Sequence, residues 1–354
     1  MTAPLVWFNH GYSGLRDVVL LAQAGARGRV RLLASHTDRE APVMDAADES
    51  LPEPSGVAAD SPAYVDWCVG VCRGRGVRLF SPQRGRVAVA RARKRFHDEG
   101  VILAVAADAD VLETLDDKAA FAEAAGTAGL PVPWTRRVRT VEEFDAARAA
   151  FAGSGGLCVK PARGAFGHGF WRLTPGHGLL STLVRTDRRE LDPDTLRRAL
   201  REAGGAEGDL VLMEHVPGAE WSVDLVCRAG AVREVVARRK GEGGQELETE
   251  GPAVELARAA VGHFGLSGLV NVQVRGPAAG ELKLLEINAR PSGGVFMTAL
   301  CGVNLPWTFV ADALGMPVRR GKPTAGVRAR PVSDAVATGG GESFARRVRG
   351  HRHA

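Results

Sequence analysis

The sequence is poor in the features that mark secreted, membrane and thiolate-metal proteins. It has five cysteines in 354 residues, at positions 68, 72, 158, 227 and 301, an odd number without metal-type spacing. This pattern indicates free thiols in a reducing compartment. The apolar run at residues 5–8 is too short for a membrane span or a signal-peptide core, and no basic region precedes it. We therefore expect a cytoplasmic protein in which Cys68 and Cys72 are small buried hydrophobic residues.

Several catalytic motifs are also missing. The sequence has no Ser/His/Asp pattern, HExxH zinc motif or redox CxxC pair that would indicate a nucleophilic, zinc-dependent or thiol-redox enzyme. The loop at residues 11–14 follows an apolar run, but it lacks G-x-G-x-x-G and a suitably placed acidic residue. This argues against dinucleotide binding.

The positive charge is concentrated at the C-terminal end. The net charge is +5, yet nine of the 46 Lys and Arg residues and only two of the 41 Asp and Glu residues lie at positions 319–354. The preceding part keeps 37 basic and 39 acidic residues and is slightly negative, at −2. The tail is glycine-linked and poor in aromatic residues, which favours a solvated extension over a nucleic-acid site.

The first third of the chain alternates strand and helix patterns. The composition, 45% hydrophobic and 25% charged, is that of an ordinary globular protein with room for two or three domains. Alternating strands and helices predict a parallel sheet with helices on both faces. The acidic, proline-containing segment at residues 45–54 is expected to be an exposed loop without chemistry. Strands are predicted at residues 5–9, 30–35, 77–80 and 101–105, and helices at 15–24, 64–73 and 85–98.

Three polar residues alternate with apolar residues in one segment of the last third of the chain. In the segment at residues 281–294, Glu286, Asn288 and Arg290 are separated by single apolar residues. On a strand these side chains point to the same face, where burial without partners would cost several kcal/mol, on the order of 2–7. Carboxylate and amide oxygens suit Mg²⁺, and an arginine suits phosphate. The segment therefore predicts a metal-nucleotide site.

Upstream residues add groups that suit phosphates. Lys160 ends a predicted strand at residues 157–160, and the loop that follows contains Gly164, Gly167 and Gly169. Glycines let backbone N–H groups approach an anion while the lysine neutralises it, although an ordinary glycine-rich turn fits the pattern as well. Glu220, beyond a Pro-Gly turn, is equally well explained as an exposed hairpin residue.

Taken together, five short motifs resemble the ATP-grasp superfamily. The similarity is strongest to the branch that includes the large subunit of carbamoyl phosphate synthetase and many carboxylate-amine ligases, and it covers residues 5–317. The motifs are Asp117-Lys118, Val159-Lys160-Pro161 with its glycine loop, the segment from Glu214 to Glu220, Asn271-Val272-Gln273, and the segment from Glu286 to Arg290.

The resemblance implies a fold of the α/β plus α+β class. A Rossmann-like parallel sheet would precede a two-lobed ATP-grasp fold. The implied domains are a pre-ATP-grasp domain at residues 1–112, an N-terminal lobe with a mobile lid at 113–212, a C-terminal lobe with the metal site at 213–320, and the basic Gly/Arg-rich tail at 321–354.

The resemblance also implies roles around the nucleotide. Lys118 and Lys160 would contact the phosphates of ATP, with Lys160 also catalytic, and the loop of Gly164, Gly167 and Gly169 would close over them. Three further positions would hold the nucleoside: Glu214 and the backbone through Val216 at the adenine, and Glu220 at the ribose.

The remaining implied roles concern the metal and the reaction. Gln273, Glu286 and Asn288 would ligate Mg²⁺, with Mn²⁺ as an alternative, and Arg290 would stabilise the phosphoryl group in transfer. Candidates for binding the substrate carboxylate, chosen by location, are Arg238, Arg239, Ser292, Gly293 and Gly294.

The implied activity is an ADP-forming carboxylate-amine ligase. Its partners would be a small carboxylic acid and an amine or thiol, with no membrane partner, and a homodimer is left open. A small-molecule kinase and an ATP-binding regulator without turnover are the alternatives. A single ATP-grasp unit argues against carbamoyl phosphate synthesis, and no biotin-carboxylase signature is present.

Overall fold

The computed structural model describes residues 2–12, 14–153, 155–164, 168–204, 209–277, 280–318 and 321–332. The chain forms two compact units. Unit 1 comprises the described parts of Met1–Leu112, Trp221–Val272 and Asn288–Ala354, and unit 2 those of Glu113–Glu220 and Gln273–Ile287. The division into two units does not test the four domains expected from the sequence, which stay a prediction.

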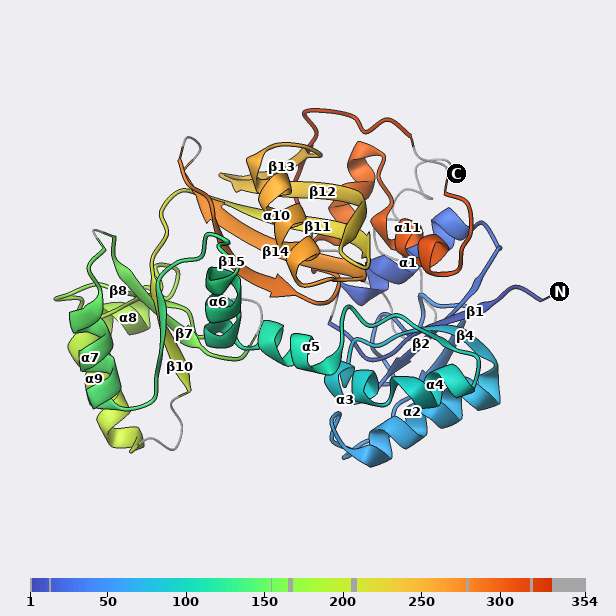
Figure 1. Ribbon diagram of the computed structural model, residues 1–354, viewed down its shortest axis with the longest axis horizontal. Coiled ribbons are helices and arrows are strands. Elements are labelled where there is room, and N and C mark those ends of the chain that lie inside the picture. Colours follow the sequence, from blue (N-terminus) through green and yellow to red (C-terminus); the bar gives the residue numbers. More distant parts are fainter. Residues whose placement is uncertain are drawn as a thin grey trace, which may run out of the picture. The chain divides into compact units, whose positions relative to one another are not determined.

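A five-stranded parallel sheet forms the first part of unit 1. Its order is β3-β2-β1-β4-β5, and all four pairings are parallel. The buried apolar run of β1 is typical of a strand covered on both faces, and α1 and α2 lie on opposite sides of the sheet (Figure 1). The strands are β1 Leu5–Phe8, β2 Arg31–His36, β3 Glu49–Pro52, β4 Val77–Ser81 and β5 Ile102–Leu103, and the helices are α1 Leu15–Ala26, α2 Pro62–Arg75, α3 Arg86–Arg91 and α4 Arg93–Asp98.

Two local predictions in this region are wrong. Residues 45–54 are not an exposed loop, because they contain the edge strand β3 and the buried residue Glu53. The acidic and proline content hid the strand, but Pro52 is tolerated at a sheet edge. Residues 85–98 form two short helices, α3 and α4, that meet at Ala92, rather than one helix.

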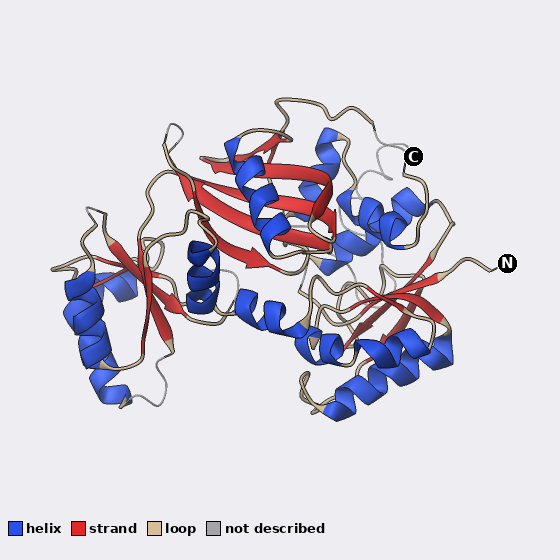
Figure 2. Ribbon diagram, viewed as in Figure 1, coloured by secondary structure: helices blue, strands red, loops and turns tan. Residues whose placement is uncertain are grey.

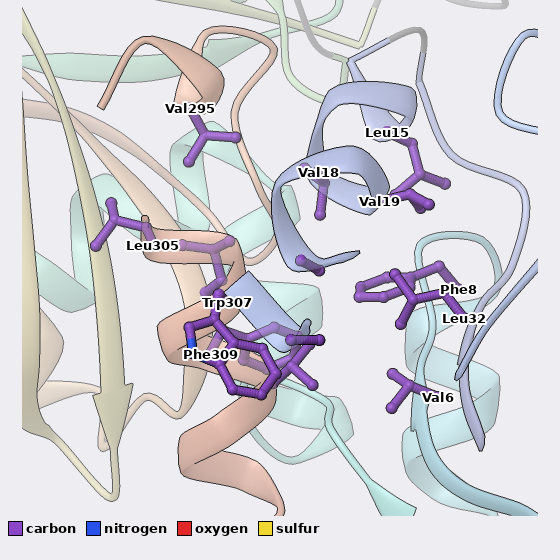
Figure 3. Close-up of a cluster of buried hydrophobic side chains, with 14 of the residues drawn as sticks. Val6, Phe8, Leu15, Val18, Val19, Leu32, Val295, Leu305, Trp307 and Phe309 are labelled. Atoms are coloured by element: carbon purple, nitrogen blue, oxygen red, sulfur yellow. The ribbon is translucent and has the colours of Figure 1, made fainter. Parts of the chain in front are cut away.

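The main core of unit 1 joins α1 to the sheet and to the C-terminal helical segments, η1 Val295–Cys301 and α11 Leu305–Ala313. The approach of α1 is close, since a Cβ atom on Gly25 would lie 2.3 Å from Cγ of Trp307. Figure 3 shows this cluster, with Val6, Phe8 and Leu32 from the strands, Leu15, Val18 and Val19 from α1, and Val295, Leu305, Trp307 and Phe309 from the C-terminal segments.

Unit 2 contains a second, mostly antiparallel sheet. Its order is β6-β10-β7-β8-β9, with a parallel pairing only between β8 and β9. Two helices, α7 and α9, lie together beside it (Figure 1). The strands are β6 Thr135–Val138, β7 Leu157–Pro161, β8 Trp171–Leu173, β9 Glu190–Leu191 and β10 Leu210–Glu214, and the helices are α6 Lys118–Thr127, α7 Val141–Ala150, α8 Leu179–Val184 and α9 Pro193–Ala203; α5 Ala109–Asp116 precedes α6.

The third sheet has the order β15-β14-β11-β12-β13-β16. The strands β14 and β15 are neighbours in this sheet. Helix α10, Pro252–His263, packs on β12, and Figure 2 shows it against the broad face of the strands. The strands are β11 Ala219–Arg228, β12 Ala231–Gly241, β13 Gly244–Glu248, β14 Gly268–Gly276, β15 Lys283–Asn288 and β16 Arg328–Ala329.

Within the described residues, no single helix has the length and apolar character needed to cross a membrane. The bent pair of η1 and α11 meets that criterion together, by length and composition only.

Candidate active site

In unit 2, Lys118 is placed by the start of α6. Asp117 caps this helix, since its carboxylate accepts hydrogen bonds from the backbone N–H groups of Ala119 and Ala120, both at 3.1 Å. The side chain of Lys118 is buried and donates from Nζ to the carbonyl oxygen of Gly164 at 3.0 Å. The lysine amine therefore lies at the glycine loop that follows β7.

Lys118 is surrounded by charges that tune its amine. Burial lowers the pKa of Lys118, the Glu286 carboxylate opposes this shift, and the Lys160 ammonium adds to it. These residues come from three different segments, so unit 2 brings together two lysines and one carboxylate that the sequence singled out. The buried Lys118 and the half-buried Lys160 are cations that would attract further negative charge, such as phosphate oxygens.

The strand β7 presents Lys160, whose Nζ lies 5.6 Å from the centroid of the Phe170 ring. Two glycines of the following loop have backbone conformations that side chains rarely adopt, with φ of 141° at Gly164 and 70° at Gly169. A Cβ atom on Gly169 would also lie 2.7 Å from the Pro161 ring. The third predicted glycine, Gly167, lies outside the described residues.

Glu214, at the end of β10, has a partner that was not predicted. Its Oε2 accepts hydrogen bonds from Lys283 Nζ at 2.8 Å and from the backbone N–H of Trp134 at 3.3 Å. Val216, two residues further on, is buried. Lys283 was missed because the sequence contains no signal that aligns the beginning of β15 with the end of β10.

Glu220 faces a second cation that was not predicted. Arg275 Nη1 lies 3.6 Å from Glu220 Oε2, and among the described residues nothing accepts a hydrogen bond from the buried Nε of Arg275. A signal for this residue was present, since Asn271, Gln273 and Arg275 continue one polar alternation along β14.

Positive charge accumulates around the loop after β10. Burial lowers the pKa of His215, and the nearby cations Arg275, Arg172 and Lys160 lower it further. Because three cations lie near one imidazole, this part of unit 2 carries positive charge that would attract an anionic ligand.

The predicted metal ligands lie on two neighbouring strands, Gln273 on β14 and both Glu286 and Asn288 on β15. All three are half-buried. Alternation along β15 turns Glu286 and Asn288 to the same face. The donor set of one carboxylate and two amide oxygens is the hard-oxygen type that Mg²⁺ accepts. The described residues contain no group of three or more His, Cys, Asp or Glu side chains suited to a metal.

Arg290 does not continue the strand as predicted. β15 ends at Asn288, and Arg290 lies in the bend that follows. The residue is buried in unit 1, donates from Nη2 to Asn288 Oδ1 at 3.2 Å, and has its Cζ 4.3 Å from the centroid of the Tyr12 ring. Its guanidinium and one predicted metal ligand are thus in contact.

Arg238 is held by a buried polar network in unit 1. Its Nε donates to Asp224 at 2.8 Å, and its Nη2 donates to the hydroxyls of Ser222 at 2.8 Å and Ser292 at 2.7 Å. Its Nη1 donates to Gln245 at 2.7 Å. All three guanidinium nitrogens are therefore engaged within the protein.

The same network fixes the loop of Ser292, Gly293 and Gly294. A Cβ atom on Gly294 would lie 2.4 Å from Arg238 Nη1, so this glycine lets the backbone pass over the guanidinium. Asp224 and Asn271, joined by a 3.0 Å hydrogen bond, complete the network. The polar alternation of Ser222 and Asp224 in an otherwise apolar strand was the signal that could have found them.

Arg239 is not brought together with this group. As the next residue on β12 it faces the other side of the strand, where Nε donates to Glu248 at 3.1 Å and Nη2 contacts Glu246. The hydrogen bond to Glu246 raises the pKa of Arg239. The two arginines proposed together as carboxylate ligands therefore face different surroundings.

Comparison with known proteins identifies the fold. Residues 206–335 match the family model described as "ATP-grasp in the biosynthetic pathway with Ter operon". No curated protein sequence matches the chain. Among solved structures, the ADP complex of the N5-carboxyaminoimidazole ribonucleotide synthetase PurK is similar, with 16% identity, a TM-score of 0.68, and coverage of 93% of this chain and 81% of that one.

Two other similar structures come from different enzymes. The L-amino acid ligase of Bacillus licheniformis has 15% identity and a TM-score of 0.61, over 92% of this chain and 76% of that one. The biotin carboxylase domain of 2-oxoglutarate carboxylase from Hydrogenobacter thermophilus, solved with MgADP, ADP and bicarbonate, has 17% identity and a TM-score of 0.62, over 91% and 72%. These likenesses confirm the predicted fold class, and the family model that matches residues 206–335 is an ATP-grasp model.

Proposed function

We propose that this protein is an ADP-forming ligase that activates a carboxylate as an acyl phosphate and couples it to an amine. The observation that carries the proposal is the position of the buried Lys118 amine in unit 2, which donates to the carbonyl oxygen of Gly164 in the loop after β7 and lies near the charges of Lys160 and Glu286. Such a site suits phosphoryl transfer, in which positioning and charge neutralisation supply most of the catalysis.

In this proposal the nucleotide is bound by unit 2. Lys118 and Lys160 neutralise the phosphates, and the loop with Gly164, Gly167 and Gly169 closes over them. The adenine lies against Glu214 and Val216, and the ribose hydroxyls bind Glu220. The cations Arg275 and Lys283 hold those two carboxylates in place through the ion pairs described above.

Gln273, Glu286 and Asn288 would hold Mg²⁺, or Mn²⁺ in its place. When bound, the metal neutralises phosphate oxygens and aligns them with the substrate. Arg290 stabilises the charge that develops on the transferred phosphoryl group, and its hydrogen bond to Asn288 keeps its guanidinium oriented.

The chemistry follows from the poor leaving group of a carboxylate. A substrate carboxylate oxygen forms a bond to the γ-phosphorus of ATP while the bond from that phosphorus to the bridging oxygen of ADP breaks. The amine nitrogen then bonds to the acyl carbon, the phosphate leaves with the C–O bond electrons, and the nitrogen loses a proton to give the amide.

The substrate assignments are refined by the contacts of the arginines. Arg238 has four internal partners, so we propose that it positions the loop of Ser292, Gly293 and Gly294, and that this loop meets the substrate carboxylate. Arg239, paired with Glu246 and Glu248, remains a weaker candidate for the same carboxylate.

The test is an incubation with Mg-ATP, a pool of amino acids and hydroxylamine, which traps acyl phosphates as hydroxamates. ADP with hydroxamate supports the ligase. ADP with a stable phosphorylated product would instead identify a kinase, and tight ATP binding without ADP release would identify a regulator.

Replacement of the carboxylate tests the metal assignment. Glu286→Ala should reduce ADP release by at least about a hundredfold, since a phosphate-bridging metal ligand is worth several kcal/mol. The matched control is Glu255→Ala on α10, an exposed carboxylate outside the proposed site, which should keep near-normal release. Unchanged turnover in Glu286→Ala would refute the assignment.

A further inference from the structure

A pair of stacked imidazoles lies at the carboxyl edge of the parallel sheet in unit 1, outside the machinery proposed above. His10 follows β1 and His36 ends β2, and their ring centroids are 3.7 Å apart with an interplanar angle of 20°. β1 lies where the strand order reverses, with β2 on one side and β4 on the other. In open parallel sheets, ligands bind beyond the carboxyl ends of the strands at such a point.

A buried carboxylate fixes the backbone that carries this pair. The side chain of Glu53 is fully buried and accepts hydrogen bonds from the backbone N–H of His10 at 2.6 Å, Ser35 Oγ at 2.9 Å, Tyr64 Oη at 2.8 Å and Arg84 Nη1 at 3.0 Å. Because its acceptor capacity is filled by these donors, Glu53 is a support for His10 and not itself a ligand group.

The Nδ1 atom of each ring has a partner in either protonation state. His36 Nδ1 lies 3.0 Å from the N–H of Asp38 and 3.2 Å from its carbonyl oxygen, so it can accept or donate. His10 Nδ1 lies 3.0 Å from the hydroxyl of Thr37, which can also donate or accept. Each ring can therefore gain a proton at Nδ1 while Nε2 keeps its hydrogen.

The two Nε2–H groups are the donors that remain. Neither has a hydrogen-bond partner among the described residues. Two imidazolium ions in face-to-face contact would repel each other, and the negative charge nearby comes from Glu53, which is neutralised by Arg84, and from Asp38. An anion that accepts from both Nε2–H groups would offset this repulsion.

We propose that His10 and His36 bind an oxyanion, either a carboxylate or a phosphate group, through their Nε2–H groups. That this group belongs to the acid or amine substrate rests on the ligase function proposed above, whereas oxyanion binding itself does not. A metal ion fits less well, because stacked rings do not aim their lone pairs at one point and the described residues offer no third ligand of the His, Cys, Asp or Glu type.

The pKa of His10 is consistent with the proposed oxyanion site. Burial lowers the pKa of His10, and the neighbouring His36 and Arg84 lower it too, while Glu53 and Asp38 raise it. His10 is therefore biased toward its neutral form, and anion binding should be accompanied by proton uptake.

The direct test follows the histidine ring nitrogens by NMR in the full-length protein, without nucleotide, during titration with sodium acetate or inorganic phosphate. The Nε2 signals of His10 and His36 should shift together and saturate, and the pKa of His10 should rise. The exposed His97 on α4 is the internal reference. A response to acetate alone identifies a carboxylate site, a response to phosphate alone identifies a phosphate site, and no saturable response to either overturns the proposal.

Matched variants separate binding from folding. His10→Asn and His36→Asn remove the Nε2 donor and should weaken binding of the effective anion by about tenfold or more, as expected for a charge-assisted hydrogen bond. His10→Gln, whose amide reaches nearer the Nε2 position, should recover part of the affinity, and His97→Asn should change nothing. Wild-type affinity in a folded His10→Asn, His36→Asn double variant would overturn the proposal.

The hydroxamate assay then distinguishes the two proposals. If the ligase proposal holds, the His10→Asn variant should raise KM for one substrate at least about tenfold while KM for ATP stays unchanged. Saturable anion binding in a protein that never forms hydroxamate would refute the ligase and leave the oxyanion site standing. Hydroxamate formation with an unchanged KM for both substrates would refute the substrate assignment of the site.

Discussion

At the scale of single residues, two neighbouring arginines on β12 show how burial changes the weight of an ion pair. Arg238 and Asp224 have side chains that are 4% and 0% exposed, whereas Arg239 and Glu246 are 41% and 38% exposed. Loss of one partner from a buried pair leaves a charge without compensation, which costs about 3–5 kcal/mol, while an exposed pair contributes about 1 kcal/mol or less.

We expect Asp224→Ala to lower the free energy of unfolding by about 3 kcal/mol, because Arg238 would keep only neutral acceptors. Glu246→Ala should lower it by less than about 1 kcal/mol. Urea denaturation of both variants measures the difference. Equal, small losses would show that the buried pair carries no special weight.

The second prediction at this scale concerns pH. The pKa of His10 in the folded protein is lowered from its ordinary value of 6.5, chiefly by burial. As the pH falls, the unfolded chain takes up this proton first, so acidification favours unfolding.

In an anion-free buffer, the free energy of unfolding should therefore fall more steeply between about pH 7.5 and pH 5.5 in the wild type than in His10→Asn. Denaturation curves at the two pH values give the comparison, and His97→Asn should follow the wild type. A parallel pH dependence in wild type and His10→Asn would contradict the shift.

At the scale of elements, the start of α6 links helix capping to ligand binding. The Asp117 carboxylate caps α6 and also pairs with Arg137 at 2.5 Å. Although burial favours the neutral acid, the hydrogen bonds from Arg137 and from the N–H of Ala120 hold the pKa of Asp117 below its usual value. The next residue is Lys118, so the cap sets the position of the lysine.

We expect Asp117→Ala to cost about 1–2 kcal/mol of stability and also to raise KM for ATP several-fold, because Lys118 loses its anchor. Thr140→Ala is the matched control, since Thr140 caps α7 through one hydrogen bond from Glu143 N–H at 3.2 Å. It should cost about 1 kcal/mol and leave KM unchanged. An equal change of KM in both variants would mean that the effect is general loosening of unit 2.

At the scale of the whole molecule, all five cysteines are free and buried. Burial raises the pKa of Cys158 to about 11 and of Cys72 and Cys227 to about 12, so the reactive thiolate is scarce near neutral pH. A thiol reagent such as DTNB should label essentially none of the five in the native protein and all five in guanidinium chloride. Rapid labelling of two or more native thiols would contradict this.

The sequence predicted the order of elements better than their lateral contacts. Apolar periodicity located α1, α2 and β4, because each is encoded in a continuous stretch of residues. The pairs of Lys283 with Glu214 and Arg275 with Glu220 join segments far apart in the chain, and no local pattern encodes them. The edge strand β3 was not predicted, because it is short and is defined by its pairing with β2 and not by a local apolar pattern.

Glu53 has a consequence for how this molecule reaches its fold. Its buried carboxylate is satisfied only when groups from residues 10, 35, 64 and 84 have all arrived, which requires β1, β2, α2 and the end of β4 to be in their native order. A sheet assembled in another order would leave this charge without donors. Glu53 should therefore form its contacts after the transition state, so that Glu53→Gln speeds unfolding while leaving the refolding rate nearly unchanged. One carboxylate would in this way lengthen the lifetime of the native arrangement.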